Sequence, residues 1–143
     1  MDWLPAEQRV VVTGLGAITP CGLSVAEMWH NVRAGRSGAG YITLFDTSEY
    51  LVKIAGEAWG VDPLDFMPAK EARRADRTTQ FSLAAASQAM QQANLEITPH
   101  NAYDIGVMIG SGAGGIWTYM REYDAIHTRG PRSVSPLLIP LIV

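Results

Sequence analysis

Side chains able to act as nucleophile, acid or base are few and far apart in this sequence. Cys21 lies in a short loop with no predicted base beside it, and a thiol without such a neighbour is more often structural than nucleophilic. None of the three histidines, His30, His100 and His127, has a cysteine or carboxylate at metal-ligand spacing. The sequence therefore predicts no catalytic residue and no metal site among its own side chains.

Two glycine-rich turns are the other places where chemistry could occur. Gly14-Leu-Gly16 begins like a dinucleotide-binding fingerprint, but the third glycine, a helix starting there and a later acidic residue are missing. Residues 110–115 lack the lysine of a phosphate-binding loop, and the spacing around Ser111 does not fit a nucleophile elbow. We expect Ser111 to stabilise its turn, and we expect no cofactor.

Basic residues are concentrated in one short stretch of a net acidic chain. Lys70, Arg73, Arg74 and Arg77 follow the i, i+3, i+4, i+7 spacing that predicts one face of a helix over 70–77. This face is either an ordinary solvated one or a docking surface for an acidic partner. The charge pattern alone leaves both interpretations open.

The elements that would position these residues alternate between strands and helices. Apolar runs over 9–13 and 105–109 predict strands covered on both faces. A shorter strand is expected within 53–59, after a flexible connector over 35–40. Strands that alternate with helices and short links predict an α/β layered fold.

Three helices are predicted between and after these strands. Ser24 and Glu27 form a capping box that starts a helix ending at Gly35. Alanines spaced four residues apart predict a helix over 78–95 that packs deep in the molecule. A third helix, over 116–127, is expected to turn three large apolar side chains inward: Trp117, Met120 and Ile126.

Composition narrows the class of protein. A net charge of −3 argues against a nucleic-acid partner, and no apolar run approaches the ~18 residues of a membrane span. A single cysteine, and no leader pattern in residues 1–5, favour a cytoplasmic protein.

The C-terminal residues 136–143 carry no charge, so we expect a chain truncated within an element. A buried C-terminal strand is the alternative, which Pro140 disfavours.

Taken together, these segments resemble the N-terminal part of the β-ketoacyl-acyl carrier protein synthases, most closely the synthase II type. The resemblance runs through nearly the whole chain, in the family's order. The matching residues are Arg9-Val-Val-Val-Thr-Gly-Leu-Gly16, Trp29, Ala34-Gly-Arg-Ser-Gly38, Phe45-Asp-Thr-Ser48, Ala55-Gly56, Asp76, Leu95-Glu-Ile-Thr98, Ile109-Gly-Ser-Gly-Ala-Gly-Gly115 and Gly130-Pro-Arg-Ser-Val-Ser-Pro136.

This resemblance implies an α/β fold of the thiolase type, with layers in the order α-β-α-β-α. Residues 1–143 would be the N-terminal portion of its N-terminal domain, truncated before the nucleophile. The implied reaction is decarboxylative Claisen condensation of an acyl chain with malonyl-acyl carrier protein in fatty acid biosynthesis. The family's Cys-His-His set does not match Cys21 or the three histidines, so this chain alone is expected to be inactive. The implied partners are acyl carrier protein, acyl and malonyl thioesters, and a second copy when full length.

Five residues match positions to which the family gives a role. Lys70, Arg73, Arg74 and Arg132 correspond to basic residues presented to the acidic carrier protein. Ala113 corresponds to a residue lining the acyl pocket. Two other functions stay open: a non-catalytic module that binds an acyl carrier or pairs with another synthase subunit, and the start of a polyketide synthase condensing domain.

Overall fold

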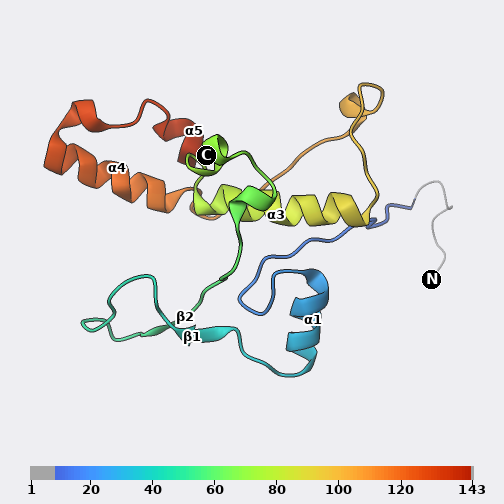
Figure 1. Ribbon diagram of the computed structural model, residues 1–143, viewed down its shortest axis with the longest axis horizontal. Helices are drawn as coiled ribbons and strands as arrows, with labels where there is room; N and C mark the ends of the chain where they lie inside the picture. Colours follow the sequence, from blue (N-terminus) through green and yellow to red (C-terminus); the bar gives the residue numbers. More distant parts are fainter. Residues whose placement is uncertain (1–8, 143) are drawn as a thin grey trace.

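The computed structural model describes residues 9–142, which form helices joined by long loops and one small hairpin (Figure 1). Residues 1–8, where no leader pattern was found, and Val143 of the apolar tail lie outside this description. The elements in chain order are α1 (Val25–Arg33), β1 (Ala39–Tyr41), β2 (Ile54–Gly56), η2 (Pro63–Asp65), α2 (Ala69–Ala72), α3 (Arg77–Gln92), η3 (Ala102–Asp104), α4 (Ile116–Arg129), η4 (Pro131–Ser133) and α5 (Leu138–Ile142).

Helix α1 starts at the predicted capping box. The Ser24 hydroxyl accepts from the Glu27 amide at 3.2 Å, and the Glu27 carboxylate accepts from the Leu23 amide at 2.8 Å. These two bonds satisfy amides that have no partner within the helix. Helices α3 and α4 also match their predicted ranges to within a few residues. Helix α4 ends where Gly130 adopts a φ of 84°, a value that favours glycine.

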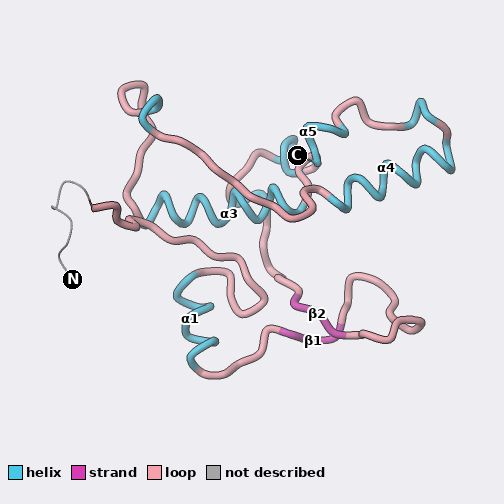
Figure 2. Tube along the Cα trace, turned by 180° about the vertical axis from the view of Figure 1, so that it is seen from behind, coloured by secondary structure: helices cyan, strands magenta, loops and turns pink. Residues whose placement is uncertain are grey.

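The hairpin is the only sheet within the described residues. Strand β1 pairs antiparallel with β2, with Gly40 opposite Ala55, and both are magenta in Figure 2. The strand expected within 53–59 is confirmed as β2, whereas β1 begins inside the stretch predicted as a connector. Glu57 holds the long turn of the hairpin, because its carboxylate accepts from the Thr43 and Leu44 amides and from the Trp59 indole.

The strands predicted over 9–13 and 105–109 are wrong for this structure. Both segments are loop, and most of their apolar side chains are exposed, almost fully so at Val10 (99%) and Met108 (98%). A strand exists only when a neighbour pairs with its backbone, and no described segment pairs with Val10–Val12 or with Val107–Ile109. Their composition favours strands, but the pairing partners are missing from residues 9–142.

Just after the first of these segments, helix α3 bonds the backbone of the extended chain. Gln92 accepts from the Leu15 amide at 2.6 Å, and Gln88 accepts from the Ala17 amide at 3.1 Å. Four residues of helix rise about 6 Å, nearly the length of two extended residues. Glutamines at i and i+4 of the helix can therefore reach alternate amides of an extended chain.

The first glycine turn packs directly on α3. A Cβ at Gly14 would overlap the carbonyl of Ala89, and a Cβ at Gly16 would overlap the carbonyl of Ala85. The glycines thus permit close approach of two backbones. This use of Gly14 and Gly16 agrees with the rejection of a dinucleotide fingerprint.

The described residues enclose very little core. The buried apolar residues are Met67, Ala72, Ala84 and Ala125. The expectation that α3 packs deep is wrong, because Ala84 is its only buried residue. Trp117, Met120 and Ile126 of α4, expected to face inward, are 57%, 57% and 40% exposed. Total accessible surface is 11507 Å², against about 7,200 Å² for a folded monomer of this mass.

The apolar tail forms helix α5 rather than the alternative strand. It lies next to α4 (Figure 1), and the Ile142 carbonyl accepts from the Gly115 amide at 3.1 Å. Pro140 lies within this short helix, where the tail turns back toward the second glycine turn. Within residues 9–142, none of the helices combines the length and apolar content needed to cross a membrane.

Candidate functional site

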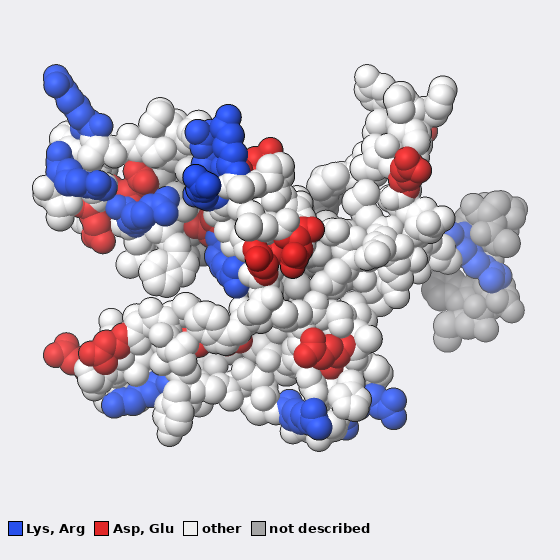
Figure 3. All heavy atoms as spheres, in the orientation of Figure 1, with Lys and Arg blue, Asp and Glu red and all other residues white. Residues whose placement is uncertain are grey.

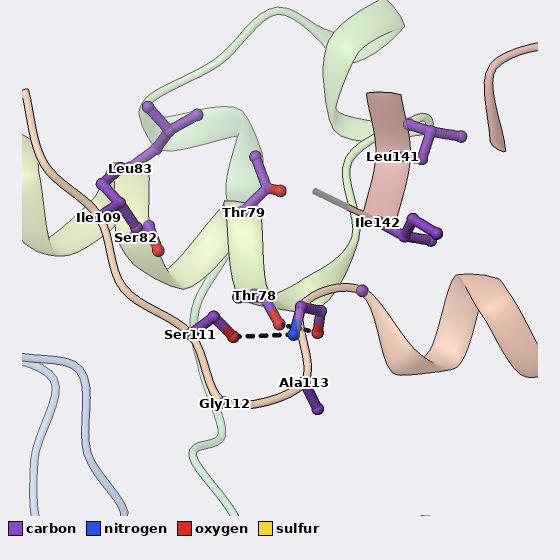
Figure 4. A pocket seen from close by; sticks show the side chains of 12 residues that line it. Thr78, Thr79, Ser82, Leu83, Ile109, Ser111, Gly112, Ala113, Leu141 and Ile142 are labelled. Carbon is purple, nitrogen blue, oxygen red and sulfur yellow. Dashed lines mark hydrogen bonds between the residues drawn. The ribbon is translucent and has the colours of Figure 1, made fainter. Parts of the chain in front are cut away.

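A cavity of about 620 Å³ opens where α3, the second glycine turn and α5 meet. The first two turns of α3 form one wall, residues 109–115 form a second, and the last residues of α5 close a third (Figure 4). Most of the exposed surface in this cavity is apolar, with hydroxyls from Thr78, Thr79 and Ser82 among its lining residues. Such a lining suits an apolar ligand that carries a polar head.

The glycine turn is held by hydroxyl groups at both ends. The Ser111 hydroxyl accepts from the Gly114 amide at 2.9 Å, which confirms the predicted turn-stabilising role of Ser111. The Thr78 hydroxyl donates to the Gly114 carbonyl at 3.0 Å, which ties the turn to α3. Gly114 has a φ of 57°, in the left-handed region that favours glycine. Ala113 lies between these anchors, at the exposed bend of the turn and on the cavity wall.

One buried carboxylate joins the two helices beside this turn. Asp76, 6% exposed, accepts from the Thr78 amide at 3.2 Å and so caps α3. Its other oxygen accepts from the Thr118 hydroxyl at 2.7 Å and the Thr118 amide at 3.1 Å, in the first turn of α4. The N-termini of both helices therefore converge on a single anion, the charge that a helix N-terminus favours.

The electrostatic effect of this arrangement appears in the pKa of Asp76. Burial would raise the pKa of the carboxyl group, but the hydrogen bonds from Thr118 and Thr78 outweigh burial and lower the pKa. The folded pKa therefore lies below the unfolded value of about 3.9. Ionised Asp76 stabilises the fold fully at pH values above its unfolded pKa. This stabilisation is lost as the pH falls through the folded pKa.

Sequence reasoning placed Asp76 among the matching family residues but gave it no structural role. The signal that could have identified it is local, because aspartate two residues before a free amide is a common helix cap. Its bond to Thr118 joins residues 42 positions apart. No spacing rule predicts that contact.

The predicted basic helix over 70–77 is interrupted. Helix α2 ends at Ala72, and α3 begins at Arg77 with Asp76 as its cap. The break arises because the Asp76 carboxylate satisfies the amide of a new helix start. Lys70, Arg73 and Arg74 are exposed around α2. Arg77 turns away from a common face, because its guanidinium lies 4.3 Å from the Phe81 ring centroid and donates to the Ala58 carbonyl.

Arg132 lies in η4, beyond the end of α4. Glu122, buried on α4, accepts from the Ser135 amide at 2.7 Å, and the Ser133 hydroxyl donates to the Ala125 carbonyl at 2.9 Å. These bonds fix the turn that presents Arg132, which is exposed. In Figure 3, Lys and Arg lie over the upper left and upper centre, the region of α4 and the start of α3 in Figure 1, and also along the lower edge.

The remaining nucleophile and base candidates do not converge. Cys21 is half-buried, and its backbone is held by Thr19 and Asn31. His30, His100 and His127 are exposed, and the His127 ring bonds the Tyr123 carbonyl one turn back on α4. In the described part of the chain, no group of His, Cys, Asp and Glu side chains is arranged to hold a metal.

Comparison with known proteins identifies the family of this segment. The family model described as "Beta-ketoacyl synthase, N-terminal domain" matches residues 7–142. The 3-oxoacyl-[acyl-carrier-protein] synthase 2 of Coxiella burnetii is 43% identical over 134 residues, and that of Staphylococcus aureus strain COL is 42% identical over 136. These matches cover 94% and 95% of this chain. The chain spans about a third of the length of these relatives, 32% and 33%.

Solved structures agree on the fold. A β-ketoacyl synthase from Burkholderia phymatum superposes with a TM-score of 0.75 at 21% identity, over 94% of this chain and 34% of that one. The ishigamide ketosynthase/chain length factor gives a TM-score of 0.73 at 29% identity, over 93% and 33%. A type II polyketide ketosynthase in complex with its acyl-carrier protein gives 0.62 at 21% identity, over 93% and 34%.

These likenesses confirm the predicted class, a partial thiolase-like α/β fold that represents an N-terminal portion. They agree with the family-model match over residues 7–142. The chain belongs to the β-ketoacyl synthase family, and residues 7–142 match the model of its N-terminal domain.

Proposed function

We propose that residues 1–143 are the N-terminal portion of a 3-oxoacyl-[acyl-carrier-protein] synthase, ending before its nucleophile. The observation that carries this proposal is the 43% identity to a synthase 2 over 94% of the chain. The full-length gene product would elongate acyl chains by decarboxylative Claisen condensation with malonyl-acyl carrier protein. It would act in the cytoplasm as a homodimer on acyl and malonyl thioesters.

In this proposal the segment supplies carrier docking and part of an acyl pocket. Lys70, Arg73, Arg74 and Arg132 are exposed and would meet the acidic carrier protein. Ala113 lies on the wall of the 620 Å³ cavity and would contact the acyl chain. The direct test is formation of β-ketoacyl product by the full-length gene product from acyl-carrier and malonyl-carrier substrates.

A polyketide condensing domain is the second candidate, favoured by the likeness to the ishigamide ketosynthase/chain length factor at 29% identity. The curated synthase 2 relatives are more similar in sequence, so fatty acid elongation is the better supported function. The product distinguishes the two. One condensation per acyl chain supports a fatty acid synthase, whereas a chain extended repeatedly without reduction supports the polyketide function.

Reversing the charge around α2 should weaken carrier binding. With Lys70, Arg73 and Arg74 all changed to Glu, we expect affinity for acyl carrier protein to fall at least about tenfold at low salt, because three exposed ion pairs of roughly 0.5 kcal/mol each are lost. The difference should shrink at high salt, where exposed charges are screened. Binding is measured on the full-length gene product by titration at two salt concentrations.

The control carries the same change of charge on another part of the surface. Arg33, Arg36 and Lys53 are exposed. Arg33 belongs to α1, Arg36 follows that helix and Lys53 precedes β2. Figure 1 shows α1 and β2 below α3 and α4. Changing these three to Glu should alter carrier affinity far less. Equal losses of affinity in the two triple variants would mean that net charge alone governs carrier binding. If the Lys70, Arg73 and Arg74 variant keeps its full affinity, the basic residues around α2 form only an ordinary solvated face.

A further inference from the structure

The glycine turn that carries Ala113 leads directly into α4, and a buried contact ties the N-terminus of α4 to Asp76. Thr118, in the first turn of α4, is 3% exposed, and both its hydroxyl and its amide donate to Asp76. Gly115 is the residue immediately before this helix. A shift of the α4 N-terminus relative to Asp76 therefore moves the exit of the turn.

The same carboxylate restrains the turn from its other side. Asp76 caps α3 at Thr78, and the Thr78 hydroxyl holds the Gly114 carbonyl at 3.0 Å. Gly115 lies so close that a Cβ there would come within 3.1 Å of the Asp76 carboxyl carbon and 2.6 Å of the Leu141 carbonyl. The turn is thus held between two helix ends that share a single anion.

We infer that Asp76 is a positioning residue that fixes the Ser111–Gly115 turn and thereby sets which acyl chains the cavity accepts. The selectivity part of this inference rests on the proposed function. Ala113 lies two residues before the Gly115 contact, so displacement of α4 changes the cavity wall at Ala113. Apolar pockets discriminate by about tenfold or more for one methylene when their walls are fixed. A loosened wall should lose that discrimination.

Two substitutions separate the contacts of Asp76. Asp76→Asn keeps the shape but offers one acceptor oxygen in place of two, so it can serve only one of the two helix ends. Thr118→Val keeps the volume and the amide but removes the hydroxyl donor. Thr118→Ser restores that donor and is the conservative rescue. Thr128→Val is the matched control, because Thr128 is an exposed threonine on α4 whose hydroxyl bonds only its own helix, at Asp124.

Two readouts are taken on the full-length gene product: amide hydrogen exchange over residues 110–118, and the ratio of kcat/KM for acyl-carrier substrates that differ by two methylenes. Asp76→Asn and Thr118→Val should speed exchange at Gly114–Thr118 about tenfold and should flatten the substrate ratio by about tenfold. Thr118→Ser and Thr128→Val should keep both values near those of the parent. The ratio is the decisive readout, because a purely structural role would lower activity on all chains equally.

The outcomes separate the inference from the proposed function. If the parent makes no β-ketoacyl product, the proposed function and the selectivity part are both overturned, and the exchange data still decide whether Asp76 positions the turn. Unchanged exchange in both variants overturns the positioning role. Faster exchange with an unchanged substrate ratio overturns the selectivity role. If Asp76→Asn does not fold, Thr118→Val provides the same two measurements.

Discussion

Purified residues 1–143 are expected to be oligomeric or aggregated, to bind a hydrophobic dye strongly and to unfold without a cooperative transition. The physical reason is the accessible surface of 11507 Å², about 4,300 Å² more than a closed monomer of this size exposes. Monomers rarely expose an apolar patch above a few hundred Å². Helices should persist because they are locally capped, which is the behaviour of a molten state. Gel filtration, dye fluorescence and thermal melting measure the three properties.

A double variant tests whether dye binds at the exposed apolar segments. Val107 and Met108 are 82% and 98% exposed, so Val107→Ser with Met108→Ser should lower dye fluorescence without changing helix content by circular dichroism. A sharp monomer peak with cooperative unfolding would contradict the expectation. The non-catalytic module would then become the better supported function of this chain.

Helices were predictable from the sequence because their signals are local. The Glu27 amide bonds the Ser24 hydroxyl, and the Leu23 amide bonds the Glu27 carboxylate, so both bonds lie within five residues of chain and start α1 where the capping box indicates. Helix α3 follows its four-residue alanine spacing in the same way. Which face of a helix is buried depends on neighbouring elements. The inward orientation expected for Trp117 and Met120 therefore does not hold within residues 9–142.

Two of the predicted strands were not found, because a strand depends on a partner that can be distant in sequence. Val10–Val12 and Val107–Ile109 have strand composition, yet a strand is defined by its partner, and neither segment pairs with a described one. Just after the first segment, the Gln88 and Gln92 side chains bond the Ala17 and Leu15 amides. This contact joins residues more than seventy positions apart, and it could not be inferred from either segment alone.

The candidate site was predictable from the sequence only where its signals are local. The turn at Ser111 could be anticipated from its glycines, and its hydroxyl does hold the Gly114 amide. The roles of Ala113 and of the basic residues around α2 came from family resemblance and stay predictions. Neither the break before Asp76 nor its bond to Thr118 was foreseen, because one carboxylate serves two helices that are distant in sequence.

The final expectation is that the 143-residue chain makes no β-ketoacyl product. Condensation by this family's chemistry needs an acyl-enzyme, and covalent catalysis cannot begin without an activated nucleophile. Cys21 is half-buried, and the Thr19 hydroxyl and the Asn31 amide hold its backbone in a loop. The family resemblance assigns no catalytic role to any of the three histidines, and we expect none. We therefore expect turnover at least about 10⁴-fold below that of the full-length gene product, the scale of loss when a nucleophile is removed.

The measurement is β-ketoacyl product formed from acyl and malonyl carrier thioesters, with intact-mass analysis for an acyl adduct on the protein. Cys21→Ala is the matched variant and should leave the result unchanged, because Cys21 has no catalytic role in the proposed function. Product that disappears in Cys21→Ala would make Cys21 the nucleophile and overturn its structural assignment. Product that persists in Cys21→Ala would show that other side chains within residues 1–143 perform the chemistry. That outcome would overturn the expectation of an inactive chain, which follows from finding no nucleophile beside a base among the described residues.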